Sequence, residues 1–160
     1  MIGLSEGASI AHMIASRDKS IKIIALLSGI GSKGSEIIDY QIKNGLLPEK
    51  DLSKILQKDR NMRFLFDFDP LETIRMINQP VLIVQGQTDR RVPATDAFII
   101  ADELMNSGNE NVTMHVLPYH NHALLKEDSA GFQSSYGNIS TTALSEEVLE
   151  LILSWVQNEI

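Results

Sequence analysis

A serine flanked by glycines stands near the start of the chain, in Gly3-Leu4-Ser5-Glu6-Gly7. This is the G-x-S-x-G pattern of a nucleophile elbow, in which a tight turn between a strand and a helix lifts the serine hydroxyl above a sheet. The backbone N–H of the next residue, Glu6, can then stabilise an oxyanion. Alone, the pattern also fits an ordinary glycine-flanked turn, so Ser5 needs partners before it indicates chemistry.

A serine hydroxyl becomes a nucleophile when a base takes its proton and a third group orients that base. Asp89 offers the orienting group, in a loop that follows the apolar segment Pro80–Gln85. His122 offers the base, in a loop that follows the segment Val112–Leu117. We expect both segments to be strands, and the order Ser, Asp, His occurs in one class of serine hydrolases. The three residues together predict a catalytic triad of Ser5, Asp89 and His122.

Each partner has a plainer interpretation. Asp89 follows Gly-x-Thr, which is ordinary turn chemistry, and His122 also fits a structural loop histidine. His120 is a rival base two residues away, whereas His12 lies in an expected helix and His115 in an expected strand. The His-x-His pair lacks acidic or cysteine partners at ligand spacing, so we predict no metal site.

A second glycine motif, Gly29-Ile30-Gly31-Ser32-Lys33-Gly34, matches the G-x-G-x-x-G pattern of dinucleotide-binding loops. That function also requires an acidic residue about 20 positions later, at the end of a second strand. Glu49 and Asp51 fall near this distance, but their segment is typical of a helix start. We therefore favour a crossover between a strand and a helical segment, with a nucleotide-binding module as a third hypothesis.

Strand-like and helix-like segments alternate along the chain. Strands are expected at 21–28, 80–85 and 112–117, and helices at 8–17, 35–45, from Pro48 onward, 69–77, 94–105 and 145–156, with mostly loop over 118–137. This alternation predicts an α/β fold with a parallel sheet and helices on both faces. Residues 35–77 are expected to form a helical, cap-like insertion that roofs the site.

The sequence resembles α/β-hydrolases of the esterase and dienelactone-hydrolase-like type. The family's acid lies in G-x-x-D-x-x-V-P, matched by Gly86 to Pro93, and its base in an Asn-His pair followed by apolar residues, matched by Asn121 to Leu124. The resemblance extends from residue 1 nearly to the end. It implies that residues 1–160 form a single domain, the C-terminal portion of this fold. It also implies that a small carboxylic ester is cleaved through an acyl-enzyme, without a cofactor.

The same resemblance implies that N-terminal strands are missing, including the strand before Ser5 and the loop that supplies a second oxyanion donor. We expect the strand Ile21–Ser28 to be left as an apolar sheet edge, through which the chain forms homo-oligomers. The alternative to a working enzyme is a catalytically incomplete fragment with only a structural or self-association role.

Composition excludes several other functions. The 160 residues are 43% apolar, which fits one globular domain, and the net charge of −7 argues against nucleic acid as a partner. The absence of cysteine excludes disulfides, thiolate zinc sites and cysteine nucleophiles. No stretch approaches the roughly 20 apolar residues of a membrane span. Met1–Gly7 does not fit a signal peptide, so the cytoplasm is only the default compartment.

Overall fold

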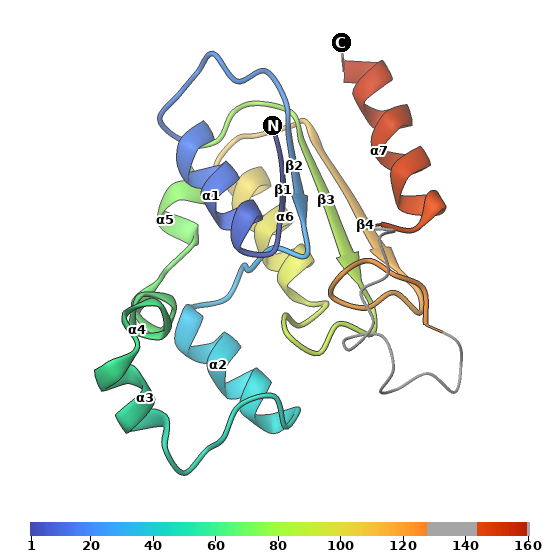
Figure 1. The fold of residues 1–160 in the computed structure, drawn as a ribbon. Coiled ribbons are helices and arrows are strands. Elements are labelled where there is room, and N and C mark those ends of the chain that lie inside the picture. The colour runs from blue at the N-terminus through green and yellow to red at the C-terminus, as the bar shows by residue number, and fades with distance from the viewer. Residues whose placement is uncertain (128–143, 160) are drawn as a thin grey trace.

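The structure, a computed structural model, describes residues 1–127 and 144–159. Its centre is a sheet of four parallel strands in the order β1-β2-β3-β4 (Figure 1). The strands are β1 (Ile2–Leu4), β2 (Ile24–Leu27), β3 (Val81–Gly86) and β4 (Val112–Leu117). The predicted α/β fold with a parallel sheet is confirmed.

Helices cover both faces of this sheet, as predicted (Figure 1). Side chains alternate along β2, so that Ile24 and Leu26 face one side while Ala25 and Leu27 face the other. The first side packs against α1 (Glu6–Ala15), α5 (Leu71–Ile74) and α6 (Asp96–Asn106), and the second against α7 (Glu146–Glu159). Burial on both sides explains why β2 is apolar at every position.

Between β2 and β3 the chain forms α2 (Gly34–Lys43), α3 (Leu52–Lys58) and α4 (Arg60–Asp67) before α5. These three helices extend beyond the carboxyl ends of the strands (Figure 1). The sequence indicated a single helix after Pro48, whereas the structure has two. The break occurs at Asp59, whose backbone is extended and whose carboxylate accepts hydrogen bonds from Asn61 N and Met62 N at 2.9 and 3.1 Å. Asp59 therefore starts a new helix as its N-cap.

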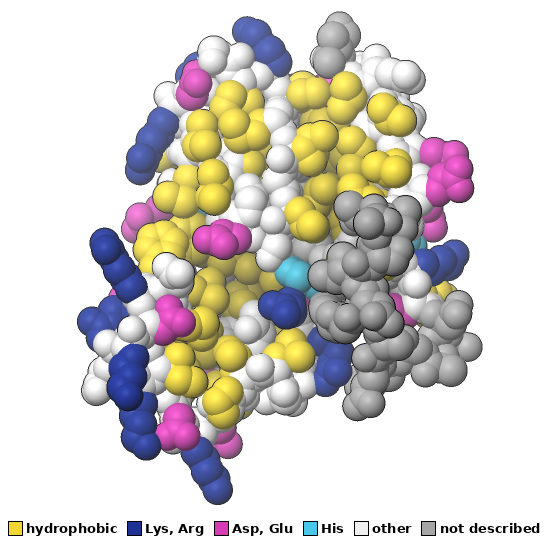
Figure 2. Space-filling model, in the orientation of Figure 1, with side chains coloured by type: hydrophobic (Ala, Val, Ile, Leu, Met, Phe, Trp, Pro, Cys, Tyr) yellow, Lys and Arg dark blue, Asp and Glu magenta, His cyan; other side chains and the backbone are white. Residues whose placement is uncertain are grey.

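The open edge of the sheet differs from the expectation. The strand before Ser5 was expected to be absent, but Ile2–Leu4 forms β1 and pairs with β2 in the register Ile2↔Ala25 and Leu4↔Leu27. The predicted edge at Ile21–Ser28 is therefore wrong, because β2 has a neighbour on each side. The edge is β1, where Ile2 and Leu4 are 56% and 39% exposed, and hydrophobic side chains gather on this face of the molecule (Figure 2).

Two other expectations concern the C-terminal third and membranes. The loop expected over 118–137 is described only as far as residue 127, where it forms turns and one antiparallel bridge between His120 and Lys126; the rest lies outside the described residues. Among the helices that are described, none has the length and apolar character to cross a bilayer.

Candidate active site

Ser5 lies on a sharp turn between β1 and α1. Its backbone has φ 56° and ψ −119°, a strained conformation for a non-glycine residue, of a kind that clusters at functional sites. Ser5 N donates to Leu27 O at 2.8 Å, which ties the turn to β2. Gly3 is required here because a Cβ at that position would lie 2.1 Å from Gly7 O. A Cβ at Gly7, by contrast, would have no described atom outside its own helix within 4 Å. Packing therefore requires a glycine at the first position of the motif and not at the second.

Asp89 is buried in the loop after β3, and both its carboxylate oxygens are held. Oδ1 accepts hydrogen bonds from Arg91 N at 2.7 Å and Val92 N at 3.0 Å. Oδ2 accepts one from Gln85 Nε2 at 2.8 Å and faces His122 Nδ1 at 2.7 Å. The side chain of Asp89 has 0% exposure, so these contacts replace its hydration.

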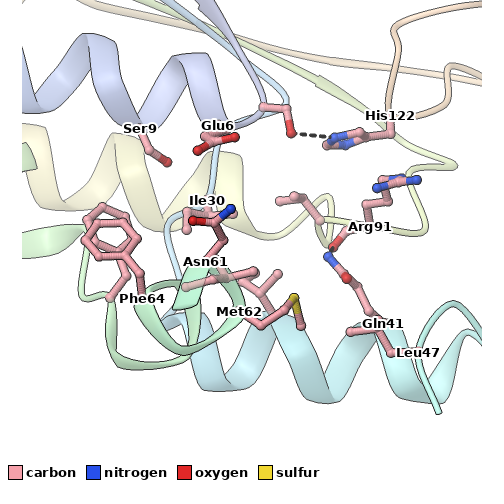
Figure 3. A pocket seen from close by; sticks show the side chains of 15 residues that line it. Glu6, Ser9, Ile30, Gln41, Leu47, Asn61, Met62, Phe64, Arg91 and His122 are labelled. Carbon is pink, nitrogen blue, oxygen red and sulfur yellow. Dashed lines mark hydrogen bonds between the residues drawn. The ribbon is translucent and has the colours of Figure 1, made fainter. Parts of the chain in front are cut away.

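His122 lies in the turn that follows β4, and its ring bridges Asp89 and Ser5. Nδ1 faces Asp89 Oδ2, and Nε2 lies 2.8 Å from Ser5 Oγ, the contact drawn in Figure 3. Since a carboxylate oxygen accepts, Nδ1 carries the proton and Nε2 is left to accept from the serine hydroxyl. The turn is shaped by Asn121, whose Oδ1 accepts hydrogen bonds from Ala123 N at 2.9 Å and Leu125 N at 3.2 Å. The structure therefore brings the three predicted residues together in one hydrogen-bonded chain.

The other histidines lie elsewhere. His120 is buried with Nδ1 2.8 Å from Pro118 O and Nε2 3.1 Å from Ser145 Oγ, so it joins the loop to the start of α7. His12 is buried in α1, where it contacts Thr73 Oγ1 at 2.8 Å and stacks on Phe68 at 6.0 Å between ring centroids. Burial lowers the pKa of His12 from 6.5 to about 4. His115 is exposed on β4.

A pocket of about 360 Å³ opens beside Ser5 and His122. Its walls are mainly apolar side chains from the segment between β2 and β3: Ile30, Ile37, Met62, Phe64, Leu65 and Phe68. Figure 3 shows Ile30, Met62 and Phe64 across the pocket from His122. Helix α2 contacts the loop that holds Asp89, because Tyr40 OH donates to Asp89 O at 2.8 Å. The helices that form the pocket are thus joined directly to the loop that holds Asp89.

In the glycine-rich segment Gly29–Gly34, two backbone N–H groups bind a carboxylate of the chain instead of facing a ligand. Gly31 N and Ser32 N donate to Asp96 Oδ2 at 2.8 and 3.0 Å, and Ser32 Oγ donates to Asp96 Oδ1 at 2.8 Å. Asp96 is fully buried, and burial raises its pKa. The N–H groups that a phosphate would need are therefore occupied by a carboxylate of the chain itself. Residues 44–51 also form no strand, so the nucleotide-binding hypothesis lacks its second element.

Sequence reasoning missed Gln85 and Asp96. Gln85 is the one polar side chain in the buried strand β3, and that isolation was the available signal. In the sequence, Asp96 looks like an ordinary acidic residue in the first turn of a helix. Its hydrogen-bond partners lie more than sixty positions earlier in the chain, so no local pattern indicates them.

Comparison with known proteins places this chain in a family. The prolyl oligopeptidase family matches residues 3–137, a range that includes Ser5, Asp89 and His122. No curated protein sequence matches the chain. An acylaminoacyl peptidase from Pyrococcus horikoshii superposes with a TM-score of 0.56 at 17% identity, over 76% of this chain and 19% of that one.

Two further solved structures are similar. A protein from Klebsiella pneumoniae assigned as a dienelactone hydrolase has a TM-score of 0.55 at 19% identity, over 96% of this chain and 49% of that one. An esterase from Pyrococcus furiosus has a TM-score of 0.51 at 23% identity, over 73% and 43%. These identities indicate a common fold, and the chain spans less than half the length of each of the three structures.

The resemblance to α/β-hydrolases is therefore confirmed by the sheet, by the solved structures and by the family match. That match extends over most of the chain, from the first glycine of the serine motif to beyond His122. The chain belongs to the prolyl oligopeptidase family, a family of hydrolases with the α/β-hydrolase fold.

Proposed function

We propose that this chain carries the catalytic machinery of a serine hydrolase that cleaves a carboxylic ester through an acyl-enzyme. The observation that carries the proposal is the unbroken hydrogen-bonded chain from Ser5 Oγ through His122 to Asp89, beside an apolar pocket. Membership of a hydrolase family supports it. The roles are Ser5 as nucleophile, His122 as base and acid, and Asp89 as the group that orients His122.

In the proposed reaction Ser5 Oγ attacks the ester carbonyl carbon while its proton passes to His122 Nε2. The tetrahedral intermediate collapses, and the leaving alkoxide takes that proton and departs as the alcohol. Water then attacks the acyl-enzyme and gives a proton to His122 Nε2. That proton returns to Ser5 Oγ as the carboxylic acid leaves. Asp89 stabilises the imidazolium of both steps through the 2.7 Å contact with Nδ1.

Glu6 would supply one oxyanion donor. It is the first residue of α1, so its backbone N–H has no acceptor within the helix and lies at the positive end of the helix dipole. The resemblance implies a second donor from a loop that precedes the serine motif. One such donor is typically worth ~10²–10³ in rate.

The pocket supports a substrate with an apolar group next to the scissile carbonyl. Phe64 and Phe68 stack at 5.6 Å between ring centroids and form an aromatic wall. Its volume of about 360 Å³ is at the small end of ligand pockets, which range over ~300–1,000 Å³. A short acyl chain or a single ring fits this space better than a large polar group.

A peptide or amide bond is the second candidate substrate, because the family match is to a family of peptidases. The same three residues serve both bonds, and only the leaving group differs. The remaining alternative is the catalytically incomplete fragment, in which the three side chains meet but no turnover follows.

The test compares the chain with Ser5→Ala, using Ser20→Ala as the matched control, since Ser20 is exposed and does not line the pocket. We expect hydrolysis of a nitrophenyl butyrate and covalent labelling by a fluorophosphonate, both lost in Ser5→Ala and kept in Ser20→Ala. A peptide nitroanilide cleaved faster than the ester would favour the peptidase candidate. Absence of both labelling and turnover in the unaltered chain would refute the proposal and leave the incomplete fragment.

A further inference from the structure

Gln85 occupies an unusual position for an amide side chain. It is 1% exposed, near the carboxyl end of β3, where every other side chain is apolar. Its Nε2 lies 2.8 Å from Asp89 Oδ2 and 3.4 Å from Val92 O. Oδ2 is the same oxygen that faces His122 Nδ1 at 2.7 Å. Gln85 and His122 therefore share one carboxylate oxygen.

The orientation of this amide is determined by its neighbours. Asp89 Oδ2 and Val92 O both accept hydrogen bonds, so the NH₂ group of Gln85 must face them. The carbonyl Oε1 then lies buried, without a hydrogen-bond partner among the described residues. A buried acceptor without a partner destabilises a fold, so stability alone does not explain a glutamine at this position.

We infer that Gln85 is a positioning residue for the proposed reaction: its amide N–H fixes Asp89 Oδ2 in the direction of His122 Nδ1. The inference rests on the proposed function of Ser5, Asp89 and His122. Asp89 Oδ1 already accepts hydrogen bonds from Arg91 N and Val92 N. The hydrogen bond from Gln85 to Oδ2 therefore restrains the second oxygen of the same carboxylate.

The amide also stabilises negative charge on Oδ2. When His122 Nε2 takes the proton of Ser5, the imidazolium must keep its Nδ1 proton, because Asp89 orients the ring without itself becoming protonated. Without the amide of Gln85, Asp89 Oδ2 would be freer to rotate away from His122 Nδ1. The fraction of His122 in the productive tautomer would then fall.

Gln79 provides a matched control within the same strand region. It lies two residues before β3, at the opposite end from Gln85, is 9% exposed, and donates from Nε2 to Ala15 O at 3.0 Å. Its Oε1 accepts from Asn78 N at 3.1 Å. Methionine has nearly the same length as glutamine and no hydrogen-bond donor. Gln85→Met therefore removes one buried amide from β3, and Gln79→Met removes one from the segment just before β3. Only Gln85→Met removes a contact to Asp89.

The first readout is steady-state ester hydrolysis. Gln85→Met should lower kcat by roughly 10- to 100-fold, the size expected for a lost hydrogen bond to a charged group, with KM nearly unchanged. Gln79→Met should keep kcat within about twofold of the unaltered chain even if it unfolds more easily. Gln85→Asn is one methylene too short to reach Oδ2. It should lower kcat as much as Gln85→Met does, and it provides a second test variant if the methionine variant does not fold.

The second readout does not need activity. In protein with isotope-labelled histidine, the Nδ1 proton of His122 should give a resonance protected from solvent exchange, assigned by its absence in His122→Gln. The resonance should persist in Gln79→Met and be lost or strongly shifted in Gln85→Met. If the chain lacks turnover, the proposed function fails while this experiment still decides on Gln85. An unchanged resonance in Gln85→Met, or none in the unaltered chain, would overturn the inference.

Discussion

Acid should destabilise the folded chain through His12, the imidazole buried between α1 and Phe68. Its side chain is 2% exposed, and its Nδ1 has a single partner, Thr73 Oγ1, at 2.8 Å. The other ring nitrogen, Nε2, has no partner among the described residues. A protonated ring would bury a second N–H donor without an acceptor, together with a charge, and burial accordingly lowers the pKa of His12 to about 4.

The sign and size of the effect follow from linkage. Above the unfolded pKa of 6.5, His12 is neutral in both states and contributes no pH dependence. Below 6.5 the unfolded chain binds a proton that the folded chain refuses, so stability falls as the pH falls toward about 4. At 1.36 kcal/mol for each pH unit, the loss is about 2 kcal/mol at pH 5 and roughly 3 kcal/mol near pH 4.

Urea unfolding at about pH 7.5 and about pH 5 measures this loss, and His12→Gln isolates it from the titration of carboxylates. The unaltered chain should lose about 2 kcal/mol more than His12→Gln between the two pH values. His115→Gln, which removes an exposed imidazole from β4, is the matched control and should keep the full loss. Equal pH dependence in the unaltered chain and His12→Gln would refute the argument.

Three further predictions concern the turn of Ser5, the glycine-rich loop and the sheet edge. Gly3→Ala should destabilise by about 1–3 kcal/mol in urea unfolding, because its Cβ would lie 2.1 Å from a backbone oxygen. Gly7→Ala should instead stabilise by about 0.5–1 kcal/mol as a helix-favouring change; equal effects would contradict the close approach at Gly3. Asp96→Ala, which leaves the N–H groups of Gly31 and the next residue unpaired, should cost about 2–4 kcal/mol by the same assay, and Asp96→Asn less than half of that. If the chain associates through β1, light scattering should detect an oligomer that Ile2→Lys dissociates, and a monomeric unaltered chain would exclude this association.

The central strands were predictable because their signals are local. β4 has the expected bounds, and β3 is shifted by one residue, since both are short runs of β-branched and apolar residues bounded by turn residues. β1 has only three residues, and its strand conformation depends on pairing with β2, which no local pattern reveals. α4 was missed because its residues include no buried side chain, and Phe64 is 60% exposed.

The candidate site was predictable to the level of residue type and order. Ser5, Asp89 and His122 each follow a strand, so the parallel sheet brings them to the same edge. The choice between His122 and His120 could be argued only from the neighbouring asparagine. In the structure the two rings take different partners, Ser5 and Ser145. The isolation of Gln85 in an apolar strand was a weak signal for its contact with Asp89, because a polar residue at the end of an apolar run usually marks only the end of a strand.

The pocket walls and the three residues Ser5, His122 and Asp89 are held by parts of the fold that differ in stability. Ser5 and Asp89 are held by backbone hydrogen bonds beside the buried strands β2 and β3, whereas α3 and α4 contain no buried residue. Elements with little buried apolar surface open at lower free energy than the core. Phe68 joins the two parts, because it lines the pocket and stacks on His12 under α1. Protonation of His12 should therefore loosen the pocket wall first, while the contacts among Ser5, His122 and Asp89 persist until the sheet itself unfolds.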